Sequence, residues 1–379
     1  MKTTKRILAV LLVLAMAISM AACGSSTTTT TTASDSGAST ADTAAADTAA
    51  DTAADAAADE TADAAAEIEP YMFNISYGGT PGSSMVAVME LLQEILSENS
   101  GGAFTFNAYN DNSYKESQAL DELTNNIVDL VYLASGSTCT TVTEVAYLGM
   151  PGCFRYSDDA DEFFDFEDTI SGILSEIYDG YGIHYLGLRP PTRMAIVGTG
   201  DVPTTKEALQ GKVVRVSGTW LGRLAVSMNL ATSNIGLSEL ATALQRKTID
   251  SCITGIEQVY SQMLGEVVDY ACILPETDGI GALVIDEDTW AKLSDAQKAC
   301  VEESVAQWME ECLTISNEFY EQAISHLEEN NVEIYHYSDE ECDEFLSTVP
   351  DVYTEIDEQT TDLGHSLRDA VLEFREAHS

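Results

Sequence analysis

Hydrophobic and polar residues alternate in several short stretches of this chain, with the period of a half-buried β-strand. In "YMFNISY" (71–77) the residues Tyr71, Phe73, Ile75 and Tyr77 fall on one face, and "FTFNAY" (104–109) repeats the alternation. The pattern predicts further strands at 128–133, 183–188, 194–198, 212–216, 249–253, 267–274 and 281–285.

Helical spacing of apolar residues separates these strands. One helix is expected through Met85 and Ile95 and ends at Gly101-Gly102, and another begins at the capping-box pattern of Ser113. Further helices are expected at 158–179, 219–229, 237–246 and 256–264. Because strands and helices alternate, the pattern predicts an α/β fold with mostly parallel, buried sheets.

The pattern changes after Trp290. Residues 294–330 contain neither glycine nor proline and keep helical apolar spacing throughout. A helix of this length runs for more than about 50 Å at 1.5 Å per residue. It is longer than one lobe of a protein, so we expect it to brace two.

The N-terminal part has a different composition. Residues 1–22 combine a basic start with an apolar run, as in a signal peptide, and the following Cys23 completes a lipobox-like "MAAC". Ser, Thr, Ala and Asp dominate the rest of 23–69, which indicates a disordered linker behind a lipidated cysteine. Residues 70–379 exceed what one core usually supports, so two lobes are expected.

Charge and cysteine content narrow the possible partners. The chain has 63 acidic and 17 basic residues and a formal net charge of −46. This charge disfavours nucleic acid as a partner, and a bare anionic membrane face would repel it. Seven further cysteines match no zinc-binding or CxxC spacing, so we interpret them as small core residues.

Motifs for catalysis are absent from the sequence. It contains no P-loop, no complete dinucleotide-binding fingerprint, no H-E-x-x-H and no G-x-S-x-G. Nothing assembles a nucleophile, a base and an orienting group. We therefore expect no enzyme activity, no cofactor and no metal, with a secreted α/β hydrolase as a remaining alternative.

Six blocks, in order, resemble the extracytoplasmic solute-binding proteins of TRAP transporters, the DctP-like family. The most specific block is "TTKEALQGKVVRV" (204–216). The others are "SENSGGAFTFNAY" (97–109), "QALDELTNNIVDLVYLASG" (118–136), "LGMPGCF" (148–154), "LSELATALQRKTIDS" (237–251) and "DTWAKLSDAQKACV" (288–301). The resemblance covers nearly all of 70–310.

The resemblance implies a periplasmic-binding-protein-like fold with two α/β lobes, a cleft between them and the long helix bracing both. We expect lobe I at 70–191 plus about 281–320, and lobe II at about 192–280 plus 321–379. The expected ligand is a small organic anion, which the protein would deliver to the small and large integral membrane subunits of the transporter. Presentation of the ligand to a sensor kinase is the alternative. The expected location is extracytoplasmic, with a lipid anchor at the outer face of the cell membrane.

Arg215 is the first candidate for ligand binding, because the family arginine at this position pairs with the ligand carboxylate. Its sequence context gives two readings, since a guanidinium between β-branched residues requires an anion in contact. That anion is either a ligand or a carboxylate of the chain. The second family arginine corresponds best to Arg193, with Arg189 as the competitor.

Other candidates follow from position or from departures from the family pattern. Thr254, Leu237 and Gly218 stand where the family often has Asn, an aromatic and a polar residue, which makes the predicted pocket less polar. Trp220 either covers the apolar part of a ligand or packs between the lobes. Tyr77 and Asn110 follow strand ends, where doubly wound folds place ligands.

Overall fold

The computed structural model describes residues 68–79, 81–109, 116–156, 160–277 and 279–378. Within it, residues 64–379 form one compact unit. The predicted signal peptide at 1–22, Cys23, most of the predicted linker and the candidate Asn110 lie outside the described residues.

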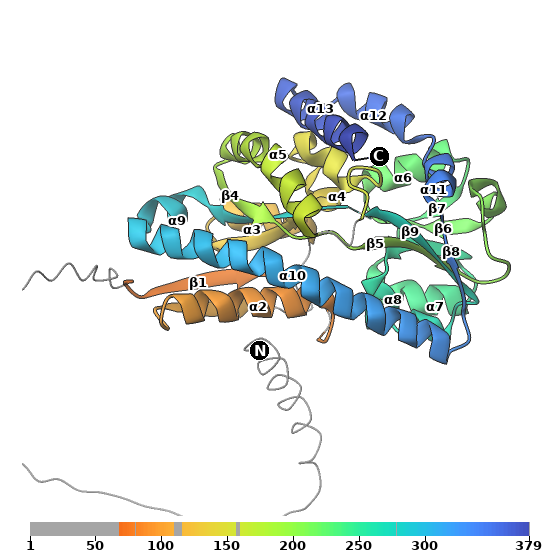
Figure 1. The fold of residues 1–379 in the computed structure, drawn as a ribbon, viewed down its shortest axis with the longest axis horizontal. Helices are drawn as coiled ribbons and strands as arrows, with labels where there is room; N and C mark the ends of the chain where they lie inside the picture. The colour runs from red at the N-terminus through yellow and green to blue at the C-terminus, as the bar shows by residue number, and fades with distance from the viewer. Residues whose placement is uncertain (1–67, 80, 110–115, 157–159, 278, 379) are drawn as a thin grey trace, which may run out of the picture. The chain divides into compact units, whose positions relative to one another are not determined.

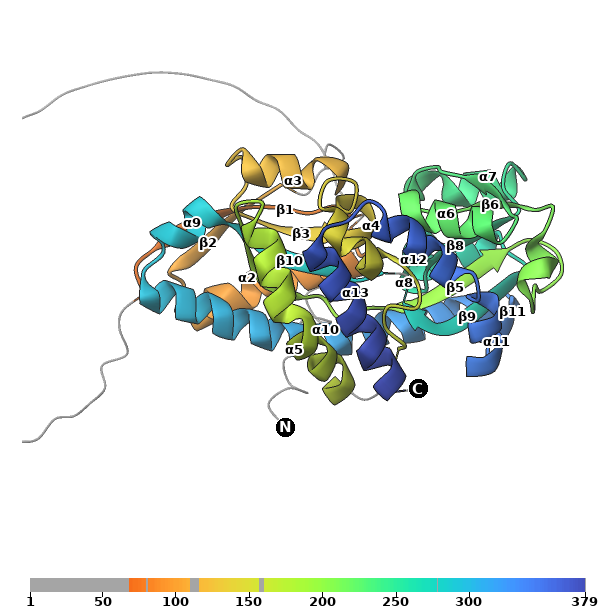
Figure 2. The ribbon, with the colours of Figure 1, turned by 90° about the horizontal axis from the view of Figure 1, so that it is seen from above.

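Two β-sheets organise this unit (Figures 1 and 2). The first sheet has the order β2 (Phe104–Tyr109), β1 (Tyr71–Ser76), β3 (Leu130–Ala134), β10 (Gly281–Asp286) and β4 (Ile183–Leu188). The second has the order β11 (Glu333–His336), β9 (Tyr270–Thr277), β5 (Arg193–Gly198), β8 (Ser251–Gly255), β6 (Val213–Arg215) and β7 (Ala231–Ser233).

Both sheets are mixed. Strand β1 runs parallel to β2 and β3, β6 runs parallel to β7 and β8, and β11 runs parallel to β9. Strand β10 is antiparallel to β3 and β4, and β5 is antiparallel to β8 and β9. The chain passes directly from the first sheet to the second between β4 and β5 and returns between β9 and β10, so β5 and β10 enter their sheets from the opposite end. It crosses a third time, through the helices between β10 and β11. The prediction of mostly parallel sheets therefore holds for the strand pairs that do not involve β5 or β10.

Helices occur where the apolar spacing predicts them. The α-helices are α2 (Ser84–Asn99), α3 (Glu116–Thr124), α4 (Ser135–Thr138), α5 (Ala160–Asp179), α6 (Thr219–Ser227), α7 (Leu240–Gln245), α8 (Glu257–Ser261), α9 (Glu287–Lys292), α10 (Asp295–Glu329), α11 (Asp339–Phe345), α12 (Val349–Asp357) and α13 (Asp362–Ala377). Two short helices, α4 and α9, and three helices after the long helix were not predicted. Short 3₁₀ segments are η1 (Thr143–Gly149), η2 (Lys206–Leu209), η3 (Leu237–Glu239) and η4 (Leu264–Glu266).

Helix α10 extends along both sheets, as its length predicts (Figure 1). It begins at a capping box in which the Ser294 and Gln297 side chains each accept a hydrogen bond from the other residue's backbone N–H, at 3.3 and 2.8 Å. Its first half packs against α2, where Trp308 Nε1 donates to Val88 O at 2.7 Å inside one apolar cluster. Its second half places Ala323 and Leu327 in a different cluster with the second sheet. The predicted bracing is confirmed.

The C-terminal helices cover one side of the unit. Helix α13 packs against α5 and η1, and α12 packs against α6 and η1 (Figure 2). The seven cysteines of the described residues are all free and buried, as their interpretation as core residues predicts.

Candidate ligand-binding site

Arg215 is the last residue of β6. It lies in register with Cys252 of β8, and after it the chain turns through Gly218 into α6. The residue is only 5% exposed. A guanidinium at this depth loses hydration and keeps its charge, so its N–H groups require acceptors.

The contacts of Arg215 leave part of this requirement unmet. Its Nε donates to Ile235 O at 3.1 Å, and no carboxylate of the described residues lies within 4.0 Å of the guanidinium. Neither Nη atom is among the side-chain atoms that are sealed from solvent without a partner. In the described part of the chain, Arg215 therefore has no structural ion pair and keeps donors for an anion.

Strand β8 supplies the neighbours of Arg215. Cys252 and Thr254 are two residues apart, so their side chains leave the strand on one face. Burial raises the pKa of the Cys252 thiol to about 11, against the opposing effect of the Arg215 guanidinium. The thiol therefore stays neutral and does not balance the charge of Arg215. Thr254 is 6% exposed, and its hydroxyl makes no hydrogen bond to the described residues.

Arg189 has a partner within the chain that the sequence did not reveal. Its Nη2 donates to both oxygens of Glu257 at 2.9 and 3.0 Å, and both residues are buried. Burial by itself lowers the pKa of Arg189, but Glu257, together with Tyr132 and Cys312, outweighs burial, so the pKa is raised. Arg189 is thus engaged by α8 beside the crossing between the sheets.

Arg193, the first residue of β5, lies between aromatic rings. Its guanidinium carbon is 3.9 Å from the centre of the Tyr156 ring and 4.3 Å from that of Tyr320. The backbone N–H of Ile256 donates to Arg193 O at 2.9 Å, which places Arg193 beside the end of β8. Arg193, Thr254 and Arg215 therefore lie on three adjacent inner strands of the second sheet, toward the same end of these strands.

Gly218 has a structural role that its lack of a side chain explains. Its φ is +82°, and a Cβ at this position would lie 2.8 Å from Gly136 O in α4, which follows the first sheet. Trp220 packs in an apolar cluster with Val214 and Val216, which supports the packing alternative for this residue.

Two further candidates belong to the cores. Tyr77 is 3% exposed, and its hydroxyl accepts a hydrogen bond from Gln93 Nε2 of α2 at 3.3 Å. Leu237, in η3, packs half-buried against the cluster beneath the second sheet. The structure does not bring Tyr77 into contact with Arg215, whereas Leu237 lies two residues from the carbonyl that Arg215 binds.

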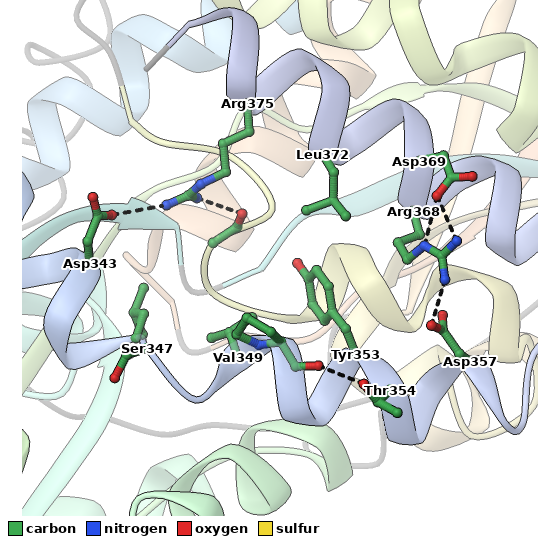
Figure 3. Close-up of a pocket in the computed structure, with 13 residues that line it drawn as sticks. Asp343, Ser347, Val349, Tyr353, Thr354, Asp357, Arg368, Asp369, Leu372 and Arg375 are labelled. Carbon is green, nitrogen blue, oxygen red and sulfur yellow. Dashed lines mark hydrogen bonds and ion pairs between the residues drawn. The ribbon is translucent and has the colours of Figure 1, made fainter.

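A separate groove of about 560 Å³ lies among α11, α12 and α13 (Figure 3). Two arginines line it, but each is neutralised by carboxylates. Arg368 contacts Asp357 at 2.5 Å and Asp369 at 2.7 Å, and Arg375 contacts Glu276 at 2.6 Å. Because the acids outnumber the arginines, this groove does not favour an organic anion, and Arg215 remains the better candidate for that ligand.

The sequence of this chain matches the model of one known protein family. Residues 75–360 match the model of DctP, described as bacterial extracellular solute-binding protein family 7. The chain belongs to this family. Among curated proteins, none matches it. In the part of the chain that the structure describes, no helix has the length and apolar character needed to cross a membrane.

Solved structures with the same two-lobed fold are distant in sequence. The periplasmic ectoine-binding protein of the TeaABC TRAP transporter of Halomonas elongata has a TM-score of 0.72 and 18% identity, with 81% of this chain and 100% of that chain covered. A TRAP periplasmic solute-binding protein of Roseobacter denitrificans with bound β-D-glucuronate gives 0.70 and 16%, covering 80% and 99%. The sugar acid binding protein of Advenella mimigardefordensis with galactonate gives 0.71 and 17%, covering 82% and 100%.

Proposed function

We propose that this family member is the extracytoplasmic receptor of a TRAP-type transporter and that it binds a small organic acid. The family supports solute binding outside the cytoplasm. Two of the similar structures hold sugar acids, glucuronate and galactonate, and these compounds carry the carboxylate that an arginine recognises. The proposed ligand is therefore a carboxylate bound between the lobes.

The observation that carries the proposal is the state of Arg215. It is buried, permanently charged and without a carboxylate partner among the described residues. Arg189, by contrast, is already paired with the carboxylate of Glu257. A ligand carboxylate that contacts Arg215 would provide the missing charge, and an Arg–carboxylate pair of this kind gives both energy and direction.

The residues around Arg215 suggest a less polar ligand than a sugar acid. Thr254 offers one hydroxyl, Leu237 is apolar, and Gly218 has no side chain to offer. Arg193 is our candidate for a second contact, reached from the neighbouring strand β5. Because this region offers few polar groups besides the arginines, it favours a ligand whose only strongly polar group is its carboxylate.

The rest of the mechanism follows from the fold and the N-terminal segment. We place the hinge at the direct crossings between β4 and β5 and between β9 and β10, with the lobe boundaries expected from the sequence. We infer that closure of the lobes traps the ligand. The closed receptor would then pass it to the membrane subunits. Lipidation of Cys23 would hold the receptor near them through the linker.

A thermal-shift screen tests this function. Monocarboxylates, dicarboxylates, keto acids and aromatic acids are added to the protein, and a ligand at 100 times its Kd stabilises the folded state by about 2.7 kcal/mol. We expect one class to raise the melting temperature of the wild type but not that of Arg215→Ala. Stabilisation of both proteins by the same acid would contradict the assignment of Arg215.

A further inference from the structure

Three potential metal ligands meet at the end of the first sheet that lies away from the crossing after β4. Asp179 is the last residue of α5, His184 is the second residue of β4, and Glu287 is the first residue of α9. One ligand atom from each lies within 4.8 Å of the others, and His184 Nδ1 is 3.6 Å from Glu287 Oε2. Asp179 and His184 flank one turn, but Glu287 is about 100 residues further along the chain, so spacing in the sequence did not reveal the group.

Backbone hydrogen bonds hold these three segments together. Gly182, with a φ of +72°, donates to Asp179 O at 3.0 Å and closes the turn between α5 and β4. Glu287 N in turn donates to Gly182 O at 3.2 Å, and Ile285 of β10 lies in register with His184. The three side chains therefore start from a connected backbone frame, which reduces the ordering cost of binding an ion.

The imidazole of His184 is oriented by Trp290. The two rings stack with centres 4.2 Å apart and an angle of 15°. The stack fixes the plane of the imidazole, and a ring that is held in place loses less freedom when one of its nitrogens binds an ion.

The donor set and the spacing fit a transition-metal ion. Ligands at about 2.0 to 2.1 Å from a tetrahedral ion are roughly 3.3 to 3.4 Å apart, close to the observed His184–Glu287 separation. One imidazole nitrogen beside two carboxylates favours Zn²⁺ and its neighbours over Ca²⁺ and Mg²⁺, which prefer oxygen alone. We propose that Asp179, His184 and Glu287 form a binding site for a divalent transition-metal ion, with water in its remaining positions.

Calorimetric titration with Zn²⁺ tests the site in the whole protein. We expect binding that weakens about tenfold or more in His184→Gln and in Glu287→Gln, because each removes one of only three protein ligands. His336→Gln is the matched control, since His336 is an exposed histidine at another place in the fold, in β11. Glu287→Gln also guards against misfolding, because it leaves the stack of His184 on Trp290 intact.

The same stack provides a local optical reporter. Paramagnetic Co²⁺ bound at His184 should quench the fluorescence of Trp290, one of three tryptophans in the chain. Quenching should be lost in His184→Gln and in Trp290→Phe, whereas Trp290→Phe should still bind Zn²⁺. The proposal would be overturned if His184→Gln and Glu287→Gln both bound Zn²⁺ with wild-type affinity. It would also be overturned if the wild type bound no Zn²⁺ up to millimolar concentration.

Discussion

The ion pairs of α13 allow a quantitative prediction about what fastens the C-terminal helices. Glu276, near the end of β9, is 0% exposed and accepts hydrogen bonds from Arg375 Nη2 at 2.6 Å and from Arg155 at 3.3 Å. Arg375 Nη1 also donates to Gly152 O at 2.6 Å (Figure 3). Helix α13 is thereby joined to the strand that leads into the second crossing.

We expect Arg375→Met to destabilise the protein by about 3 kcal/mol. Removing one partner of a buried ion pair costs roughly 3 to 5 kcal/mol, because the other charge stays buried. Arg155 still neutralises part of the Glu276 charge, which places the expected loss at the lower end. Methionine keeps most of the aliphatic volume, so the loss reports the charge and its hydrogen bonds.

Arg368→Met is the matched control on the same helix. Arg368 makes contacts just as short, but its partners Asp357 and Asp369 have side chains that are 31% and 68% exposed. Exposed pairs contribute up to about 1 kcal/mol. Free energies of unfolding from urea titration, at low and high salt, separate the two cases, since salt screens exposed pairs far more than buried ones. Equal losses in the two variants would refute the reasoning.

Two further substitutions test the buried carboxyl group of Glu167 and the close backbone contact of Gly218. Burial raises the pKa of Glu167, so the stability that its protonated form contributes is complete below the unfolded pKa near 4.3 and is lost as pH rises through the folded pKa. Glu167→Gln can still accept the 2.8 Å hydrogen bond from Tyr185 and stays neutral, so its stability relative to the wild type should be higher at pH 7 than at pH 4. A pH-independent difference in urea titrations would contradict this. Gly218→Ala should lower the free energy of unfolding by clearly more than the roughly 1 to 2 kcal/mol that a positive φ costs, because its Cβ would meet Gly136 O. Gly200→Ala is the control, since Gly200 has a φ of +93° but open space around a Cβ. Equal losses of stability in the two variants would exclude the close contact.

Periodicity predicted the elements because burial on one face imposes it directly. The stretch at 212–216 became β6 (Val213–Arg215), and the segment from Ser294 became α10 with its capping box. The short edge strands β7 and β11 were not predicted, since three or four residues carry too little alternation. Strand direction also escaped prediction, because it depends on where the chain changes sheets.

Sequence reasoning also could not predict which side chains of the candidate site are paired in the folded protein. The charge of Arg215 inside an apolar strand was visible in the sequence, and so was its need for an anion. The absence of a carboxylate partner among the described residues was not visible, because the 53 acids that follow residue 69 could have supplied one. Arg189 illustrates the other outcome, since only the folded chain brings Glu257 beside it.

The most direct test of the account is calorimetric titration of the best acid from the screen into the wild type, Arg215→Ala and Arg223→Ala. Arg223 is the matched control, an exposed arginine on α6 with a weak 3.8 Å contact to Glu355. Truncating one partner of a buried charge pair costs about 2 to 5 kcal/mol, so Arg215→Ala should bind at least roughly 30-fold more weakly, with Arg223→Ala unchanged. Wild-type affinity in a folded Arg215→Ala variant would contradict the central claim.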